Sequence, residues 1–318
     1  MKRCFVGFDT SNYTTSAAVC DEFGGVIANI KRPLPVKSGE CGLRQSDAVF
    51  AHIKNLPSLT DELSGALVGY EPIAVGVSAR PRDAEGSYMP CFLSGVAAAH
   101  SFAAPAELPI FEFSHQSGHI MAAVYSSGES ERLLSDRFLA FHVSGGTTEA
   151  LLVTPRDNSF SAELVGETLD LNAGQVIDRV GVYLGLDFPC GVALEQLAKN
   201  YAGKVSRPRI SVTDGKCNLS GLQNMAQTLF EKEKDREAVA AFVFDFICRT
   251  LIEMCRQLIE KYGEMPVLFA GGVMSNTYMR DMISSELDAC FSKPAFSADN
   301  AAGIALLCRR EYLSLQSK

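Results

Sequence analysis

The sequence has no long apolar run, which excludes the simplest membrane-spanning architecture. No stretch approaches the roughly 18 to 20 consecutive apolar residues that a membrane helix requires. The apolar run near the N-terminus, residues 4–8, is also too short for the hydrophobic core of a signal peptide. We therefore expect a cytoplasmic protein that makes no use of a membrane.

The ten cysteines of the chain form no CxxC pair. Their scattered positions argue against a zinc ribbon, and without a secretory signal buried thiols are favoured over disulfides. Low-complexity segments and blocks of like charge are absent as well, so we expect the whole chain to be folded.

Positive charge is in short supply. Lys and Arg number 29 against 37 Asp and Glu, a formal net charge of −8, so no global positive field exists to attract nucleic acid. RNA binding would then require a basic partner or a local patch. The candidate patch is Lys204, Arg207, Arg209 and Lys216, although such a run is more often a solvated face.

Two hairpins with polar turns are predicted about 135 residues apart. A phosphate needs several converging donors, and glycine lets the backbone approach closely. The second turn, Ser-Gly-Gly-Thr-Thr, meets that need, while the first supplies hydroxyls instead. The first hairpin comprises strands 4–8 and 17–20 around the turn 9–16, and the second comprises strands 138–143 and 150–153 around the turn 144–148.

A third turn follows the strand 267–270, where Gly271 and Gly272 precede a helix opening at Asn276. Two phosphate hairpins and a later Gly-Gly turn are the plan of the α/β fold shared by actin, Hsp70 and the sugar kinases (ASKHA). Ordinary tight turns are the alternative. We expect two lobes, residues 1–121 and 122–318, with a nucleotide cleft between them. Apolar spacing also predicts a long helix over 237–262 and a last helix that starts at Asp299.

Two histidines, His115 and His119, are four residues apart, a spacing that places both on one face of a helix. This arrangement suits a shared metal ion. A third ligand must come from elsewhere. Gln116 follows His115, so the glutamate that serves as base in HExxH peptidases is missing. The alternative is one core and one surface histidine.

Several stretches together resemble the TsaD/YgjD family, once called glycoprotease-like and now known as tRNA threonylcarbamoyladenosine synthase. The resemblance covers nearly the whole chain. The matching stretches are GFDTSNYTTSAAV, SHQSGHIMAA, HVSGGTTEALLV, GETLDLNAGQVIDRVGVYLGLDFPCG, NLSGLQNM, FAGGVMSN and SADNAAGIAL.

This resemblance implies a set of site residues. One divalent metal, Fe2+ or Zn2+, would be held by His115, His119 and Asp299. ATP, AMP or threonylcarbamoyl-adenylate would be the bound nucleotide. Its implied contacts are His142, Val143, Ser144, Gly145 and Gly146 at the phosphates, Asp178 and Glu195 at the ribose, and Gly191 and Asn276 around the adenosine; Ser144 and Thr147 would be catalytic.

The implied reaction moves threonylcarbamoyl from its adenylate to the adenosine beside the tRNA anticodon. Implied partners are tRNA, a smaller family paralogue and an ATPase subunit, with an adenylate synthase acting upstream. A metal ion and turn amides could stabilise the developing charge. This fits a sequence without a Ser-His-Asp or paired-carboxylate constellation.

Three departures from the family pattern keep other functions open. Tyr13 and Thr14 replace an Asp-Glu pair, Thr147 replaces a histidine, and the stretch 79–90, with Arg80 and Arg82, replaces Gly-Pro-Gly-Leu. A nucleotide-binding scaffold without transfer activity is therefore an alternative. A metallopeptidase rests only on the older family name and the histidine spacing.

Overall fold

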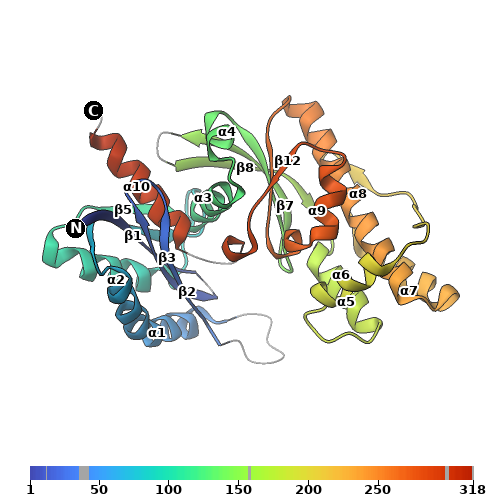
Figure 1. Ribbon diagram of the computed structural model, residues 1–318, viewed down its shortest axis with the longest axis horizontal. Coiled ribbons are helices and arrows are strands. Elements are labelled where there is room, and N and C mark those ends of the chain that lie inside the picture. Colours follow the sequence, from blue (N-terminus) through green and yellow to red (C-terminus); the bar gives the residue numbers. More distant parts are fainter. Residues whose placement is uncertain (12, 36–42, 157–158, 298–300, 317–318) are drawn as a thin grey trace. The chain divides into compact units, whose positions relative to one another are not determined.

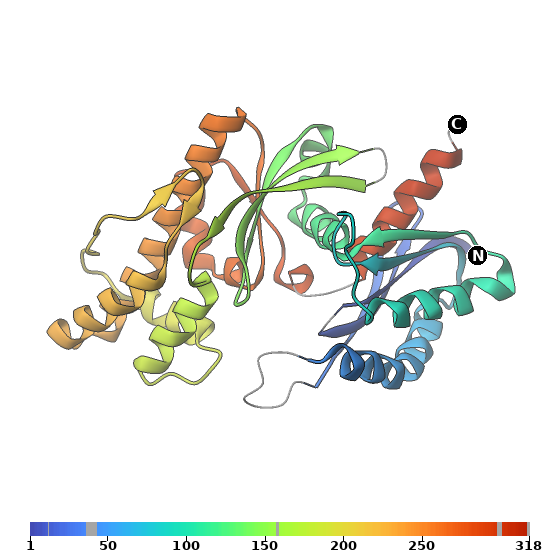
Figure 2. The same ribbon diagram turned by 180° about the vertical axis from the view of Figure 1, so that it is seen from behind.

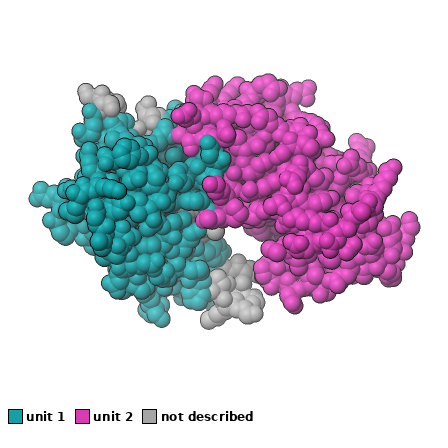
Figure 3. All heavy atoms as spheres, viewed as in Figure 1, with its two compact units in different colours: residues 1–128, 155–161, 296–318 teal, residues 129–154, 162–295 magenta. Residues whose placement is uncertain are grey.

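The structure is a computed structural model that describes residues 1–11, 13–35, 43–156, 159–297 and 301–316. It has an α/β architecture with two mixed sheets (Figure 1). The chain divides into two compact units (Figure 3). Unit 1 comprises residues 1–128, 155–161 and 296–318, and unit 2 comprises residues 129–154 and 162–295.

Unit 1 is built on a five-stranded sheet in the order β3-β2-β1-β4-β5. The β1–β2 and β2–β3 pairs are antiparallel, and the β1–β4 and β4–β5 pairs are parallel. Its strands are β1 Lys2–Thr10, β2 Thr14–Asp21, β3 Val26–Pro33, β4 Tyr70–Arg80 and β5 Ile110–Ser114; its helices are α1 Gln45–Ala66, α2 Phe92–Ala103, η1 Ala104–Ala106, α3 His115–Ser127 and α10 Ala302–Gln316.

The central strand β1 is buried on both faces, which explains its continuous apolar run. Val6 and Phe8 join the core formed with α1 and α2. Phe5 and Gly7 face α10 instead: the Phe5 ring lies 5.6 Å from that of Tyr312, and a Cβ on Gly7 would lie 2.5 Å from the Ala305 nitrogen. Helices therefore cover both faces of this sheet (Figures 1 and 2).

Unit 2 contains most of a seven-stranded sheet in the order β12-β11-β6-β7-β8-β10-β9. The far ends of β7 and β8 belong to unit 1. The strands are β6 Phe138–Val143, β7 Thr148–Arg156, β8 Ser159–Thr168, β9 Val212–Thr213, β10 Lys216–Cys217, β11 Val267–Ala270 and β12 Ala289–Phe291; the helices are α4 Ser130–Ser135, α5 Ala173–Tyr183, α6 Gly191–Asn200, α7 Ser220–Glu233, α8 Arg236–Tyr262, η2 Gly272–Ser275, α9 Thr277–Ser284 and η3 Pro294–Phe296.

The long helix α8 forms the spine of the unit 2 core. Asp235 caps its start by accepting hydrogen bonds from the main-chain N–H groups of Glu237 and Ala238, at 2.9 and 3.0 Å. Its apolar residues pack against α6, α7, α9 and the sheet. The helix predicted over 237–262 is thus confirmed.

Both predicted hairpins are confirmed, as β1–β2 and β6–β7. The division of the chain differs from the expected boundary after residue 121. Helix α10 belongs to unit 1, because it packs on the sheet faces of β1, β2 and β4 and against α3. The proposed start of this helix at Asp299 lies outside the described residues.

The described cysteines all have free, buried thiols, in agreement with the expectation of no disulfides. Among the described residues, no helix is long and apolar enough to cross a membrane.

Candidate functional site

Helix α3 brings His115 and His119 together. Ser114, the last residue of β5, caps the helix: its hydroxyl accepts a hydrogen bond from the Ser117 N–H at 3.1 Å. The Nε2 atoms of the two histidines lie 2.9 Å apart. Phe92 forms an apolar wall beside them, with its ring centre 5.8 Å from that of His115. The predicted shared helical face is confirmed.

A buried carboxylate, Asp9, orients the first imidazole. It lies near the end of β1 with 1% of its side chain exposed, and its Oδ2 is 2.9 Å from Nδ1 of His115. Its Oδ1 accepts a hydrogen bond from the hydroxyl of Ser78 on β4. Because an ionised carboxylate can only accept, we assign the proton to Nδ1. Nε2 of His115 then presents its lone pair toward His119.

This arrangement suits a metal ion. Metal-binding histidines commonly donate their second ring N–H to a carboxylate. Two imidazoles that share one ion must bring a nitrogen each to the same point, and the Nε2 atoms of His115 and His119 are 2.9 Å apart. No cluster of three His, Cys, Asp or Glu able to hold a metal occurs in the described part of the chain. The expected third ligand, Asp299, lies outside it.

The hydroxyls of the first hairpin turn are engaged within unit 1. The Thr10 hydroxyl accepts a hydrogen bond from the Gly95 N–H at 2.9 Å and donates to the Cys91 carbonyl at 3.0 Å. The Thr15 hydroxyl lies 2.8 Å from Nδ1 of His52 and accepts from the Asn55 amide at 3.1 Å. These two hydroxyls therefore hold the turn in place.

His52 is fully buried in α1. Its burial lowers its pKa, against the opposing effects of the Ser11 main chain and the Asp9 carboxylate. In the first turn, Tyr13 is exposed and Thr14 is half-buried.

The glycine-rich turn of unit 2 is closed by its own main chain. The Ser144 N–H donates to the Thr147 carbonyl at 2.7 Å, and the Ser144 hydroxyl accepts from the Thr147 N–H at 3.0 Å. Gly145 and Gly146 are exposed at its tip, whereas His142 on β6 is half-buried. The turn therefore offers exposed backbone to a ligand.

Helix α5 starts against this turn. The Gly174 N–H donates to the Ser144 carbonyl at 3.2 Å, and the Ala173 N–H donates to the Thr148 hydroxyl at 2.9 Å. A Cβ on Gly174 would lie 2.7 Å from the Gly145 nitrogen, so only glycine fits. The positive end of the α5 dipole is thus held beside the turn, which favours an anion there.

The Gly-Gly turn that follows β11 lies next to the glycine-rich turn that follows β6. Strands β6 and β11 are parallel, with Ala270 opposite His142, so their carboxyl ends coincide. Gly271 has a φ of 101°, and a Cβ on it would lie 2.3 Å from the Val143 carbonyl oxygen. Asn276 caps α9 by accepting from the Met279 N–H at 2.9 Å. The predicted strand, turn and helix are confirmed.

The residues expected at the ribose and adenosine lie at two hydrogen-bonded contacts within unit 2. Oδ1 of Asp178 accepts from the Cys190 N–H at 2.8 Å, next to Gly191 at the start of α6. Oε1 of Glu195 accepts from the N–H and hydroxyl of Thr277, at 2.9 and 2.8 Å, directly after Asn276.

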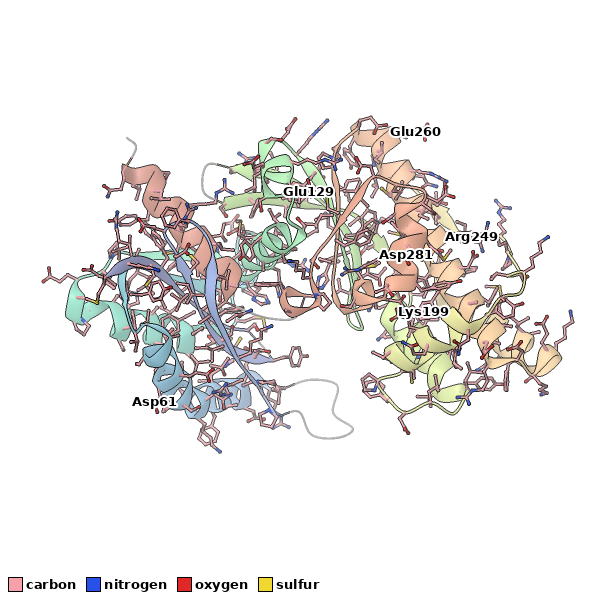
Figure 4. All side chains as sticks on the ribbon, viewed as in Figure 1. Asp61, Glu129, Lys199, Arg249, Glu260 and Asp281 are labelled. Carbon is pink, nitrogen blue, oxygen red and sulfur yellow. The ribbon has the colours of Figure 1, made fainter. Side chains whose placement is uncertain are left out.

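Oε1 of Glu195 also pairs at 2.7 Å with Lys199. Lys199 lies one turn further along α6 and is labelled in Figure 4. Partial burial raises the pKa of Glu195, but the hydrogen bonds from Lys199 and Thr277 outweigh this and lower it. The structure therefore joins Glu195 to the start of α9.

Asp170 is a further polar centre of unit 2 that spacing alone does not reveal. It fixes the start of α7, where its carboxylate accepts from the Ser220 hydroxyl at 2.6 Å and the Leu219 N–H at 2.7 Å. Burial raises its pKa, but these bonds and one from the Leu171 N–H lower it strongly overall. Asp170, the last residue of the GETLD stretch, therefore has a structural role.

The chain matches one family model, described as tRNA N6-adenosine threonylcarbamoyltransferase, over residues 46–306. It is similar to proteins of that name from Syntrophomonas wolfei, with 29% identity over 96% of this chain and 92% of the relative. The relative from Thermotoga neapolitana is also 29% identical, over 94% of this chain and 91% of its own.

Solved structures support the two-lobed fold. A ROK-family glucokinase from Streptomyces griseus, in complex with glucose and AMPPNP, superimposes with a TM-score of 0.55 at 13% identity, covering 96% of this chain and 99% of its own. Full-length HypF in a phosphate- and nucleotide-bound form gives a TM-score of 0.58 at 12% identity, covering 97% of this chain and 46% of that longer one. At these identities the likeness concerns the fold alone.

Proposed function

Because the chain belongs to the tRNA N6-adenosine threonylcarbamoyltransferase family, we propose that it transfers threonylcarbamoyl from its adenylate to the adenosine beside the tRNA anticodon. A C–N bond forms between the carbamoyl carbon and N6, the C–O bond to the phosphate breaks, AMP leaves and N6 loses one proton. The observation that carries this proposal is the histidine pair of α3, oriented by Asp9, in a chain that matches the family over most of its length.

Unit 1 would hold one divalent ion, Fe2+ or Zn2+, through His115 and His119, with Asp299 as the proposed third ligand. When bound, such an ion supplies Lewis-acid chemistry to a carbonyl or phosphate oxygen. The protein's own contribution is orientation. Asp9 holds the proton on Nδ1 of His115, and the helix keeps both Nε2 atoms on one side.

Unit 2 would bind the adenylate. Support comes from the exposed turn at Gly145 and Gly146, the adjoining N-terminus of α5 and the neighbouring Gly271 turn. We assign the phosphates to residues 142–146 and the catalytic roles to Ser144 and Thr147.

The ribose and adenosine would bind further along the same unit. The ribose hydroxyls would use Oδ2 of Asp178 and Oε2 of Glu195, since Oδ1 and Oε1 already accept hydrogen bonds. The adenosine would lie near Gly191 and Asn276. The proposed partners are tRNA, a smaller family paralogue and an ATPase subunit.

The test is a transfer assay with threonylcarbamoyl-adenylate, tRNA and the partner proteins, followed by mass spectrometry of the tRNA nucleosides. The intact chain should yield threonylcarbamoyladenosine, and His115→Ala or His119→Ala should abolish it. His100→Gln, an exposed substitution on α2, should retain activity. Absence of product from the intact chain under all metal conditions would exclude the transfer.

A second candidate function is a nucleotide-binding scaffold. The specific observation is the first turn, where the hydroxyls of Thr10 and Thr15 are engaged within the protein. The resemblance also implies that Tyr13 and Thr14 stand in place of two carboxylates. A scaffold should bind ATP or AMP in calorimetry without turnover. Detection of threonylcarbamoyladenosine in the assay above would eliminate it.

A further inference from the structure

The loop between β4 and α2 is ordered by its own hydrogen bonds. The Arg82 N–H donates to the Ser87 hydroxyl at 3.0 Å, and the Ser87 N–H donates to the Ala84 carbonyl at 3.1 Å. This loop follows β4, the strand that carries Ser78, whose hydroxyl binds Asp9.

One residue of this loop, Asp83, contacts the start of the histidine helix with one oxygen. Its Oδ2 accepts from the hydroxyls of Ser114 and Ser117, at 2.6 and 2.9 Å. Its Oδ1 accepts from Nε and Nη2 of Arg80, at 3.0 and 2.6 Å. Both oxygens are therefore engaged, and the guanidinium of Arg80 holds the carboxylate in one orientation.

The same loop contacts α3 through its main chain. The Pro81 carbonyl accepts from the Gln116 N–H at 3.0 Å. Together with the Asp83 contacts, this fixes Ser114, Gln116 and Ser117, which surround His115 in sequence. The carboxylate also lies at the positive end of the helix dipole, where a negative charge is stabilising.

We propose that Asp83 is a positioning residue for metal binding, an inference that rests on the proposed function. Asp9 fixes the ring of His115, and Asp83 fixes the helix that carries both imidazoles. A metal site tolerates little displacement of its ligands, and loss of a residue that orients them commonly costs tenfold or more in affinity. The loop would thus hold the first turn of α3 in position and would not itself be a metal ligand.

The experiment compares Asp83→Asn and Ser117→Ala with the matched control Glu85→Gln, an exposed carboxylate of the same loop. The full chain is titrated with Co2+ by absorption spectroscopy, and amide hydrogen exchange is measured over residues 114–119 without metal. We expect Asp83→Asn to weaken Co2+ binding on the order of tenfold and to speed exchange over this segment. Ser117→Ala should act in the same direction with a smaller effect.

A role in helix stability alone would lower the unfolding temperature and leave Co2+ affinity unchanged, which would overturn the proposal. Equal affinity and exchange in Asp83→Asn and Glu85→Gln would overturn it too. If the intact chain binds no Co2+, the metal part of the proposed function fails. The positioning proposal then fails with it, whereas Co2+ binding by the intact chain with equal affinity in Asp83→Asn would overturn the positioning proposal alone.

Discussion

A single buried carboxylate, Asp245, holds two arginines of unit 2. Only 2% of its side chain is exposed, and it pairs with Nε of Arg249 at 2.7 Å and Nη2 of Arg207 at 2.9 Å. Arg249, labelled on α8 in Figure 4, also donates to the Pro208 carbonyl at 3.0 Å. The loop around Arg207 is therefore tied to α8, and one member of the basic patch considered for RNA is engaged within the protein.

Removing this carboxylate should destabilise the fold. Asp245→Asn leaves the half-buried Arg249 without its ionic partner, so we expect a loss of roughly 2 to 3 kcal/mol in the free energy of unfolding. Urea denaturation measures it. Arg207→Gln is the control, because the side chain of Arg207 is 64% exposed and such pairs contribute about 1 kcal/mol or less. Equal losses in both variants would contradict the argument.

Stability should also depend on the protonation of His52. Burial lowers its pKa in the folded state below the ordinary value of 6.5, so the unfolded chain binds the proton more readily. The resulting stability is complete above about pH 6.5 and is lost as the pH falls toward the folded-state pKa.

Urea unfolding at about pH 7.5 and about pH 5.5 should show this loss in the intact chain. It should be smaller in His52→Gln and unaltered in His100→Gln, which changes an exposed histidine. An identical pH dependence in all three proteins would refute the role of His52.

Spacing predicts some of these residues and misses others. His115 and His119 are four apart on one helix, so their meeting follows from local geometry. Asp9 meets His115 across 106 positions, and Asp83 meets Ser114 across 31. Such pairs depend on which strand ends adjoin α3, and no local pattern encodes that.

At the level of elements, α3 and α10 pack with their backbones in close contact at Gly118 and Gly303. A Cβ on Gly303 of α10 would lie 1.8 Å from the Gly118 carbonyl of α3, and one on Gly118 would lie 2.8 Å from Ile304. The glycines let the two backbones touch. Helix α10 therefore supports the helix that carries the histidine pair.

Gly303→Ala should force these helices apart. We expect a loss of about 2 kcal/mol or more in the free energy of unfolding, measured by urea denaturation. Gly65→Ala in α1 is the matched control: no atom lies within 4 Å of the added Cβ, so the change should be neutral or stabilising by about 0.5 kcal/mol. Tolerance of Gly303→Ala would show that the crossing can relax.

The elements themselves were largely predictable, because each hairpin and the long helix has its own periodicity. The exception is the placement of α10. Its apolar pattern identifies a helix, but the strands of the sheet that it covers all lie within the first 114 residues of the chain. Nothing in the local sequence indicates which sheet that is.

On the scale of the whole molecule, net charge bears on the tRNA binding that we propose. The chain carries a formal charge of −8, and two residues of the only basic run considered are paired, Arg207 with Asp245 and Lys216 with Glu167. Little positive charge is left there for phosphates. A basic partner would have to supply most of the attraction to tRNA.

The isolated chain should therefore bind tRNA weakly. Fluorescence anisotropy with labelled tRNA at about 0.15 M salt should show at least roughly tenfold tighter binding once the partner proteins are added. Tight, salt-sensitive binding by the chain alone would contradict this. Loss of that binding in a Lys204→Gln, Arg209→Gln double variant would then locate it in the patch.

The division of the chain into units has a consequence for its synthesis. Unit 1 draws its sheet from the first 114 residues and one of its covering helices from Ala302–Gln316. On the ribosome, the face of β1 that carries Phe5 and Gly7 stays without that cover while all of unit 2 is being made. Unit 2 is continuous in sequence except for the seven residues 155–161, which belong to unit 1. It can therefore complete its core first. Unit 2 would then finish folding before unit 1, although the strands of the unit 1 sheet are synthesised first.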